Sequence, residues 1–196
     1  TYSRYHSWLM AAAKKLGKQT YMDLDDAPSR IQSPTTLANC ERMMRMADGV
    51  IVGSTNLLAY AKQHQRNVHW IPSSIYLKHY HVRPRPETRM PVCLGWLGNG
   101  AHYKEDLIEI LTGPLTEVAN SHRIRFKIVG ACGQPELYRN FRAIPNLETD
   151  FIDGIEWVDP SAISDAVQEF DIGLYPLLPN DFNHFKCGFK ALEYMA

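Results

Sequence analysis

Short apolar runs and amphipathic segments alternate along nearly the whole chain of 196 residues. The apolar runs have lengths typical of buried strands, and the segments between them repeat apolar residues at helical spacing. This alternation predicts an α/β protein with Rossmann-like parallel sheets that are covered on both faces. The strands are expected at residues 19–24, 49–53, 68–71, from 92 onward, 124–130, 155–158 and 171–177.

A proline-containing segment divides this pattern into two parts. Residues 79–91 hold Pro84, Pro86 and Pro91 among several charged side chains, as linkers do. The expected organisation is a first Rossmann-like domain at 1–77, a linker at 78–90 and a second domain at 91–196. The first part is too short for a doubly wound domain, and the sequence starts and stops inside apparent helices. We therefore expect a fold that is incomplete at both ends, with an exposed sheet edge that favours self-association.

Composition narrows the class of protein. Lys plus Arg and Asp plus Glu each number 21, so the formal net charge is zero and no nucleic-acid partner is expected. The four cysteines form no C-x-x-C pair, which argues against a zinc ribbon and favours a reducing, cytoplasmic compartment. His79 and His81 lack a nearby third ligand, so no metal site is expected. No secretory signal or membrane-spanning run is evident.

Two helical segments carry specific expectations. The first repeats apolar residues at helical spacing, and this face is expected to lie in the core. Its members are Tyr2, Tyr5, Trp8, Leu9, Ala12, Ala13 and Leu16. A later helix, which begins after residue 100, contains Gly113 and Pro114, and these residues should kink or restart it.

Three carboxylates follow the strand predicted at residues 19–24. Asp23, Asp25 and Asp26 lie at its carboxyl end, which is where open α/β sheets bind ligands. One interpretation is that Asp25 or Asp26 acts as a general base or contacts an acceptor hydroxyl. The alternative is that these side chains only stabilise the loop, with Asp26 favouring the turn before Pro28.

A second candidate site is the turn after the strand that begins at residue 92. Gly98 and Gly100 form a glycine-rich turn, and His102 and Lys104 lie in the helix that follows. A phosphate can bind beside such a helix start, where either side chain would neutralise it. Tyr103 takes the place of the third glycine of G-x-G-x-x-G, so a nicotinamide cofactor is not favoured.

The last twenty-six residues repeat this layout of strand, loop, glycine and helix. Gly188 precedes the final helical segment, and Lys186 and Lys190 flank it, as a phosphate site requires. Glu193 lies one turn beyond Lys190, within reach of the same ligand, where its carboxylate suits a ribose. The alternative is an ordinary strand-to-helix unit with a solvated basic loop and an exposed Glu193.

The final segment also resembles a known family. It reads K-C-G-F-K-A-L-E-Y-M-A, which is similar to the nucleotide-sugar signature of group 1 glycosyltransferases of the GT-B fold. The resemblance implies that Glu193 holds the donor ribose and that Gly188 and Phe189 lie beside the diphosphate. Phe185 stands where the family has its first glutamate.

Other segments carry the same resemblance. A-D-G-V-I-V-G-S and D-L-D-D-A are similar to segments of the family's first domain, the latter at the cleft between domains. In the second domain, Lys104 approximates a family lysine that binds the donor diphosphate, and Asn99 stands near the place of an arginine.

The resemblance implies transfer of a sugar from a nucleotide-sugar donor to a saccharide or lipid-linked acceptor. It implies retention at the anomeric carbon without a metal or another cofactor. It also implies a cytoplasmic protein whose full-length form associates peripherally with a membrane. The D-x-D within D-L-D-D lies in the wrong domain for a metal-bound donor. The alternative functions are a non-catalytic GT-B-like module that binds a nucleotide or a partner, and a nucleotide-sugar epimerase.

Overall fold

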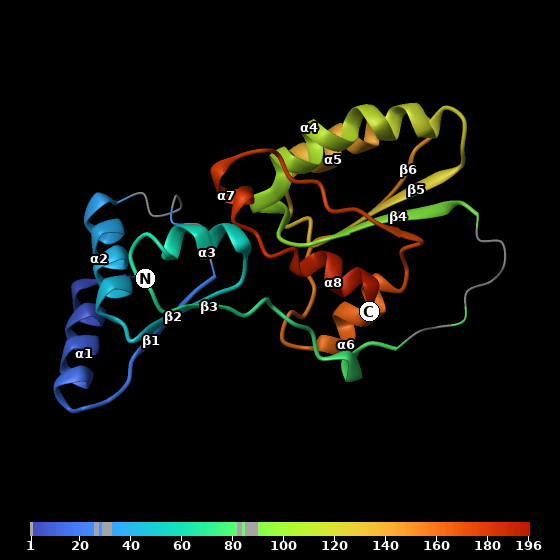
Figure 1. Ribbon diagram of the computed structural model, residues 1–196. Helices are drawn as coiled ribbons and strands as arrows, with labels where there is room; N and C mark the ends of the chain where they lie inside the picture. The colour runs from blue at the N-terminus through green and yellow to red at the C-terminus, as the bar shows by residue number, and fades with distance from the viewer. Residues whose placement is uncertain (1, 26–27, 29–32, 82–83, 85–89) are drawn as a thin grey trace. The chain divides into compact units, whose positions relative to one another are not determined.

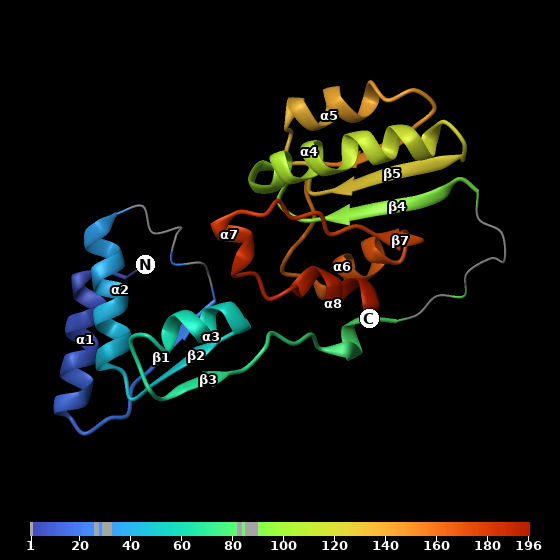
Figure 2. The same cartoon turned by 45° about the horizontal axis from the view of Figure 1, so that its top comes forward.

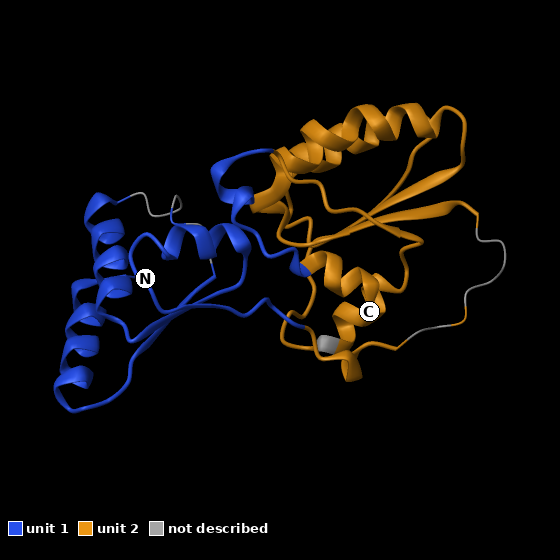
Figure 3. Cartoon of the chain, in the orientation of Figure 1, with its two compact units in different colours: residues 1–74, 179–189 blue, residues 75–178, 190–196 orange. Residues whose placement is uncertain are grey.

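The computed structural model describes residues 2–25, 28, 33–81, 84 and 90–196. The chain forms two compact units (Figure 3), one of residues 1–74 and 179–189 and one of residues 75–178 and 190–196. The expected boundary lay three residues later, and the expected second domain ran without interruption to residue 196. In the structure, residues 179–189 instead belong with the first unit.

The first unit contains a three-stranded parallel sheet with the strand order β1-β2-β3 (Figure 1). Its helices begin at polar residues that accept hydrogen bonds from the first turn, as Ser33 does from Thr36 N and Ser54 from Leu57 N. The elements are α1 (Arg4–Lys15), β1 (Tyr21–Leu24), α2 (Pro34–Met46), β2 (Gly49–Val52), α3 (Thr55–Ala61), β3 (Val68–Trp70) and the short α7 (Asp181–His184).

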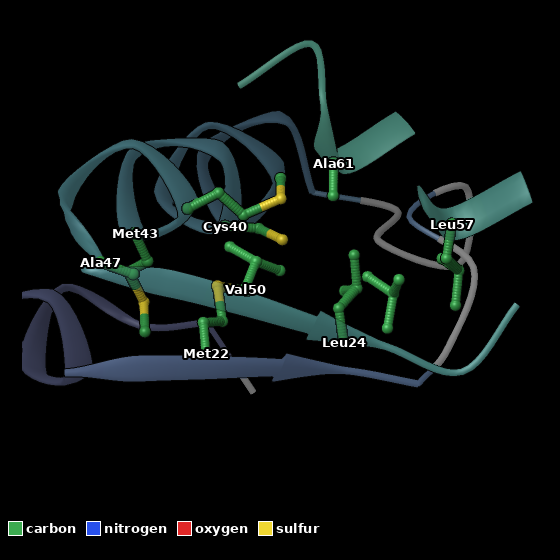
Figure 4. Packing of buried hydrophobic residues seen from close by; sticks show 10 residues of the cluster. Met22, Leu24, Cys40, Met43, Ala47, Val50, Leu57 and Ala61 are labelled. Carbon is green, nitrogen blue, oxygen red and sulfur yellow. The ribbon is translucent and has the colours of Figure 1, made fainter. Parts of the chain in front are cut away.

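The core of this unit lies between the sheet and two helices. Alternate residues of β1 and β2 point toward α2 and α3 (Figure 4), as the two-residue period of a strand requires. Leu24, Met44, Val50 and Leu57 are fully buried there. The buried cluster consists of Met22, Leu24, Cys40, Met43, Met44, Ala47, Val50, Val52, Leu57 and Ala61.

The second unit contains a four-stranded parallel sheet with the order β6-β5-β4-β7. Helices α4 and α5 cover one face of this sheet, and α6 and α8 cover the other (Figures 1 and 2). Its elements are the 3-10 helix η2 (Leu77–His79), β4 (Val92–Leu97), α4 (Gly100–Ala119), β5 (Ile124–Val129), α5 (Pro135–Arg142), β6 (Glu148–Ile152), α6 (Pro160–Val167), β7 (Ile172–Gly173) and α8 (Phe189–Met195). The prediction of Rossmann-like parallel sheets is therefore confirmed.

Two strand predictions in the second unit were wrong. Residues 155–158 form no strand, and the edge strand beside β5 is β6, Glu148–Ile152. The last strand was expected at 171–177, but only Ile172–Gly173 pairs with β4. Pro176 has no N–H for a longer ladder, which helps to explain why the apolar run continues as loop.

Two helix predictions were also wrong, at least in part. Helix α4 is not restarted at Gly113 and Pro114 but continues through both residues. Two threonine hydroxyls close to Pro114 bond to backbone carbonyls of the same helix. Thr112 Oγ1 donates to Ile108 O at 2.6 Å, and Thr116 Oγ1 donates to Thr112 O at 2.7 Å.

Most of the predicted apolar stripe of α1 does not lie in the core, although Tyr2, which precedes the helix, packs against the core cluster. Trp8 and Leu9 are exposed, whereas Ser7 is fully buried and Met10 packs against the core cluster. The helix thus contacts its unit through the side opposite to the predicted one. Among the described helices, none is long and apolar enough to cross a membrane.

Candidate functional site

The turn that follows β4 opens the longest helix of the second unit. Asn99 is the N-cap of α4, and its Oδ1 accepts a hydrogen bond from Ala101 N at 3.1 Å. Gly100 N donates to Gly130 O at 2.7 Å, and His102 N donates to Asn99 O at 3.0 Å. The first amide groups of α4 therefore already have acceptors within the protein. A phosphate oxygen could reach the Ala101 amide by replacing the side chain of Asn99.

Gly130 lies in the turn after β5 and packs against the turn after β4. Its φ of 90° is a left-handed conformation that favours glycine, and a Cβ there would lie 1.9 Å from Gly98 O. Its amide donates to Ile152 O at 2.7 Å, while Gly98 N donates to Val129 O at 2.9 Å. The ends of β4, β5 and β6 thus form one continuous edge at the carboxyl side of the sheet, where parallel sheets bind ligands.

Lys190 lies over this edge. Its ammonium is 4.4 Å from the ring centroid of Tyr103, 5.5 Å from that of Tyr175 and 5.9 Å from that of Trp96. A Cβ on Gly98 would meet Lys190 Cε at 2.7 Å, so the lysine stem crosses the turn directly. Cations are attracted to the faces of aromatic rings, and three rings hold this charge beside the start of α4.

Glu193 lies one helical turn beyond Lys190 and is 5% exposed. Burial raises the pKa of this carboxyl, and the charge of Lys190 together with a hydrogen bond from the Tyr80 hydroxyl opposes that shift. A buried carboxylate with one cation and one hydroxyl partner is held in a fixed position. It can accept hydrogen bonds from vicinal hydroxyl groups such as those of a ribose.

Two other predicted residues lie on the first turns of α4. His102 is exposed at the start of the helix. Lys104 is half-buried, and its Nζ lies 3.2 Å from Glu136 Oε1 of α5. The structure therefore gives Lys104 a carboxylate partner, whereas the sequence suggested a phosphate.

The remaining predicted residues belong to the first unit. Asp25 is exposed at the carboxyl end of β1, and its Oδ1 would lie 3.3 Å from a Cβ on Gly53. Ser73 Oγ and Cys187 Cβ would lie 3.7 and 3.6 Å from the same point, so three polar side chains converge on Gly53. Asp26 lies outside the described residues.

The last predicted site residues of the first unit lie in the segment that leads into α8. Lys186 is half-buried, and its Nζ lies 3.9 Å from the ring centroid of Phe182. Gly188 has a φ of 75°, which a glycine adopts readily, and Phe189 is 40% exposed. The structure thus brings Gly98, Asn99, Gly100, His102, Lys190 and Glu193 together in the second unit, and places Asp25, Lys186, Gly188 and Phe189 in the first.

Several residues of the site were missed in the sequence. Tyr80 was assigned to the linker, yet its hydroxyl bonds to Glu193. Trp96 and Tyr175 enclose Lys190 from two different strand ends, and no local pattern links them to it. The turn at Gly130 could be recognised in the sequence, because this glycine directly follows a strand of alternating apolar residues.

The described part of the chain contains no group of three or more His, Cys, Asp or Glu side chains that could hold a metal ion. Comparison with known protein families found no match, and neither did comparison with curated proteins.

Proposed function

We propose that this chain belongs to a glycosyltransferase and that its second unit binds the nucleotide-sugar donor. The observation that carries the proposal is the pairing of Lys190, held over Gly98 by aromatic rings, with the buried Glu193. A fixed cation and a fixed carboxylate one helical turn apart match a diphosphate joined to a ribose. The resemblance of K-C-G-F-K-A-L-E-Y-M-A to the family signature supports the same assignment.

The chemical demand of sugar transfer fits these groups. As the bond to the sugar breaks, negative charge grows on the leaving diphosphate, and a positioned cation lowers the barrier by stabilising it. Lys190 would supply that charge, His102 lies at the same helix start, and the N-terminus of α4 adds its positive end. Glu193 would orient the nucleoside by its ribose. Transfer with retention and without a metal is part of the proposal.

The first unit would receive the acceptor, which we propose to be a saccharide or a lipid-linked saccharide. Asp25 lies at the carboxyl end of β1 with its carboxylate exposed, as contact with an acceptor hydroxyl requires. Its role would be to orient that hydroxyl or to accept its proton.

A second candidate is a GT-B-like module that binds a nucleotide or a partner but does not transfer sugar. The observation that favours it is Phe185, which occupies the position of the family's first glutamate. Phe185 packs against the core of the first unit, and its ring lies 6.3 Å from that of Tyr60. A residue with this role cannot bind a sugar hydroxyl.

Calorimetric titration with UDP, GDP, ADP and dTDP tests the donor site. We expect at least one nucleoside diphosphate to bind. Lys190→Met, which keeps the apolar stem among the rings, should weaken that binding about ten- to a hundredfold, the usual loss for a charge-assisted contact. Lys62→Met removes an exposed lysine at the end of α3 and should leave the affinity unchanged. Failure of all four nucleotides to bind, or an unchanged affinity in Lys190→Met, would refute the donor site.

The variant Glu193→Gln tests recognition of the nucleoside separately from recognition of the phosphates. This variant should lower nucleoside diphosphate affinity about tenfold, as expected for loss of a charged hydrogen-bond acceptor, and leave inorganic pyrophosphate binding unchanged. An equal loss for both ligands would contradict a ribose role. Turnover of the corresponding nucleotide sugar then distinguishes the two candidate functions, because only the enzyme releases the free nucleotide. Analysis of the sugar product separates transfer from epimerisation.

A further inference from the structure

The carboxylate of Glu193 already has a hydroxyl partner within its own unit. Glu193 is 5% exposed, and the hydroxyl of Tyr80 donates a hydrogen bond to it. Tyr80 is itself half-buried, and burial, followed by the charge and the hydrogen bond of Glu193, raises the pKa of its phenol. Because so little of Glu193 is exposed, a ribose hydroxyl can reach the carboxylate only where a present partner gives way.

Helix α8, which carries Glu193, is fixed to the sheet of the second unit. The next residue, Tyr194, accepts a hydrogen bond from Leu97 N at 3.1 Å and donates one to Leu174 O at 3.2 Å. One turn earlier, the ammonium of Lys190 lies 4.4 Å from the ring centroid of Tyr103. A movement of Glu193 with its helix would break these contacts, so the carboxylate stays in place.

The segment that carries Tyr80 is held differently. Tyr80 directly follows η2, a single turn of 3-10 helix, and its amide donates to Leu77 O at 3.0 Å. The next residue, His81, has its Nε2 3.7 Å from Asp165 Oδ1, and its carbonyl accepts a hydrogen bond from Gln168 Nε2. More than half of the His81 and Asp165 side chains is exposed, and exposed ion pairs contribute little to stability. Of the two partners in this hydrogen bond, Tyr80 is therefore the one that moves at the smaller cost.

We propose that the Tyr80 hydroxyl occupies the place of a ribose hydroxyl on Glu193 and that a nucleotide displaces it on binding. The inference rests on the proposed donor site and adds the group with which the ribose exchanges. Two vicinal hydroxyls would replace one phenol, because a carboxylate has two oxygens that each accept hydrogen bonds. Until then Tyr80 satisfies a buried acceptor that would be costly to leave unpaired.

This exchange makes Tyr80 a residue that determines specificity. Inorganic pyrophosphate carries negative charge and offers no sugar hydroxyl, so it gains nothing at Glu193 and leaves the Tyr80 hydrogen bond in place. A nucleoside diphosphate brings the hydroxyl donors that replace the phenol. The pair of Tyr80 and Glu193 would thus respond to the nucleoside, while Lys190 responds to the phosphates.

Calorimetric titration of the whole chain with UDP, GDP, ADP, dTDP and inorganic pyrophosphate tests the proposal. Tyr80→Phe keeps the ring and removes the competing hydroxyl, so a nucleoside diphosphate should bind about tenfold more tightly. The affinity for pyrophosphate should stay unchanged. Tyr76→Phe is the matched control, because Tyr76 lies in the same segment, is 58% exposed and has its ring 4.9 Å from that of His79. It should leave every affinity unchanged.

The sign of the change in Tyr80→Phe decides between the possible roles of this residue. An unchanged or weaker nucleotide affinity overturns the inference and leaves the donor site standing, because Tyr80 would then not compete with the ligand. An equal gain for pyrophosphate also overturns it, since the effect would not depend on the ribose. Failure of all four nucleotides to bind the wild type and both variants would refute the donor site and the inference together.

Nitration of the wild-type chain by tetranitromethane is a second measurement that needs no substitution. The reagent attacks the phenolate form of tyrosine, and the contact with Glu193 keeps the Tyr80 phenol protonated and half-buried. A saturating nucleoside diphosphate should accelerate nitration of Tyr80 about fivefold, as measured on its peptide by mass spectrometry, whereas pyrophosphate should leave the rate unchanged. A nucleotide that binds but slows this nitration, or does not alter it, would show that the phenol stays on Glu193 and would overturn the proposal.

Discussion

At the scale of single residues, the surroundings of a lysine decide more than its chemical type whether it suits a phosphate. Both Lys104 and Lys190 are half-buried lysines near the start of α4, but Lys104 pairs with Glu136 whereas Lys190 lies among aromatic rings. A cation over an aromatic ring is stabilised by about 0.5–2 kcal/mol and remains able to bind an anion. Lys190 also interacts with the charge of Glu193, so both lysines have a carboxylate nearby. What distinguishes Lys190 is its position, because its stem crosses the Gly98 turn at the start of α4.

Gly130 supports a prediction about stability at this scale. Gly130→Ala should destabilise the protein by about 2–4 kcal/mol, because a side chain there adopts a left-handed conformation and meets Gly98 O. Gly133→Ala is the control, since its φ of 63° is also left-handed but nothing lies within 4 Å of its Cβ. It should lose only about 1–2 kcal/mol. Urea unfolding of both variants measures the difference, and equal losses would show that the contact with Gly98 is unimportant.

At the scale of elements, Asp48 connects three parts of the first unit. Its carboxylate accepts hydrogen bonds from Lys14 in the last turn of α1 and from both the amide and the hydroxyl of Thr20, which precedes β1. Asp48 itself directly precedes β2. One side chain thus aligns a helix end with the starts of two neighbouring strands.

This connection predicts a pH dependence. The hydrogen bond from Lys14, followed by that from the Thr20 amide, lowers the pKa of Asp48 to about 2. A lowered folded-state pKa gives stability above the unfolded value of about 4, and that stability is lost as pH falls through about 2. The melting temperature of Asp48→Asn should therefore lie below that of the wild type at pH 6, and the difference should shrink below about pH 4.

Thermal unfolding of both proteins between pH 6 and pH 2 measures this difference. Glu117→Gln removes an exposed carboxylate from α4 and should follow the wild-type curve. A gap between Asp48→Asn and the wild type that stays constant with pH would show that the ionised form of Asp48 does not carry the effect.

The same scale shows what the sequence could and could not predict. The strand β2 was recognisable because nearly all of its residues are buried and apolar. The strand β6 was missed because it lies at an edge and carries Glu148, Thr149 and Asp150, so its polar side chains hide the strand. The helical period of α1 was evident, but periodicity does not say which side of a helix the fold buries.

The candidate site was predictable to the extent that it is local. Lys190 and Glu193 are one turn apart on the same helix, and this spacing can be read directly from the sequence. Tyr80 and Tyr175 join them only through tertiary packing, so no pattern in the sequence could indicate their roles.

At the scale of the whole molecule, each of the two compact units has buried hydrophobic residues of its own within the described part of the chain. Met44 is fully buried between β2 and the helices of the first unit. Phe126 is fully buried in the second unit, with its ring centroid 4.9 Å from that of Phe141. Each core is built from its own sheet and its own helices, as in a two-domain α/β protein.

Two cores predict local consequences of core substitutions. Met44→Ala should cost about 2–5 kcal/mol and accelerate amide hydrogen exchange in β1, β2 and α2, but not in β4 and β5. Phe126→Ala should cost about 3–5 kcal/mol and show the reverse pattern. Hydrogen exchange followed by mass spectrometry measures both. Faster exchange throughout the chain in either variant would instead mean that the two units unfold as one.

The return of residues 179–189 to the first unit has a consequence for synthesis on the ribosome. Asn56 Nδ2 donates to the carbonyl of His184, and Ser73 Oγ donates to Cys187 Sγ, so the first unit needs residues made long after its sheet. The three strands of this sheet are synthesised before residues 75–178 of the second unit, and the segment that completes them is synthesised after those residues. While residues 75–178 are being made, the first unit must therefore exist without residues 179–189, and its completion waits for them.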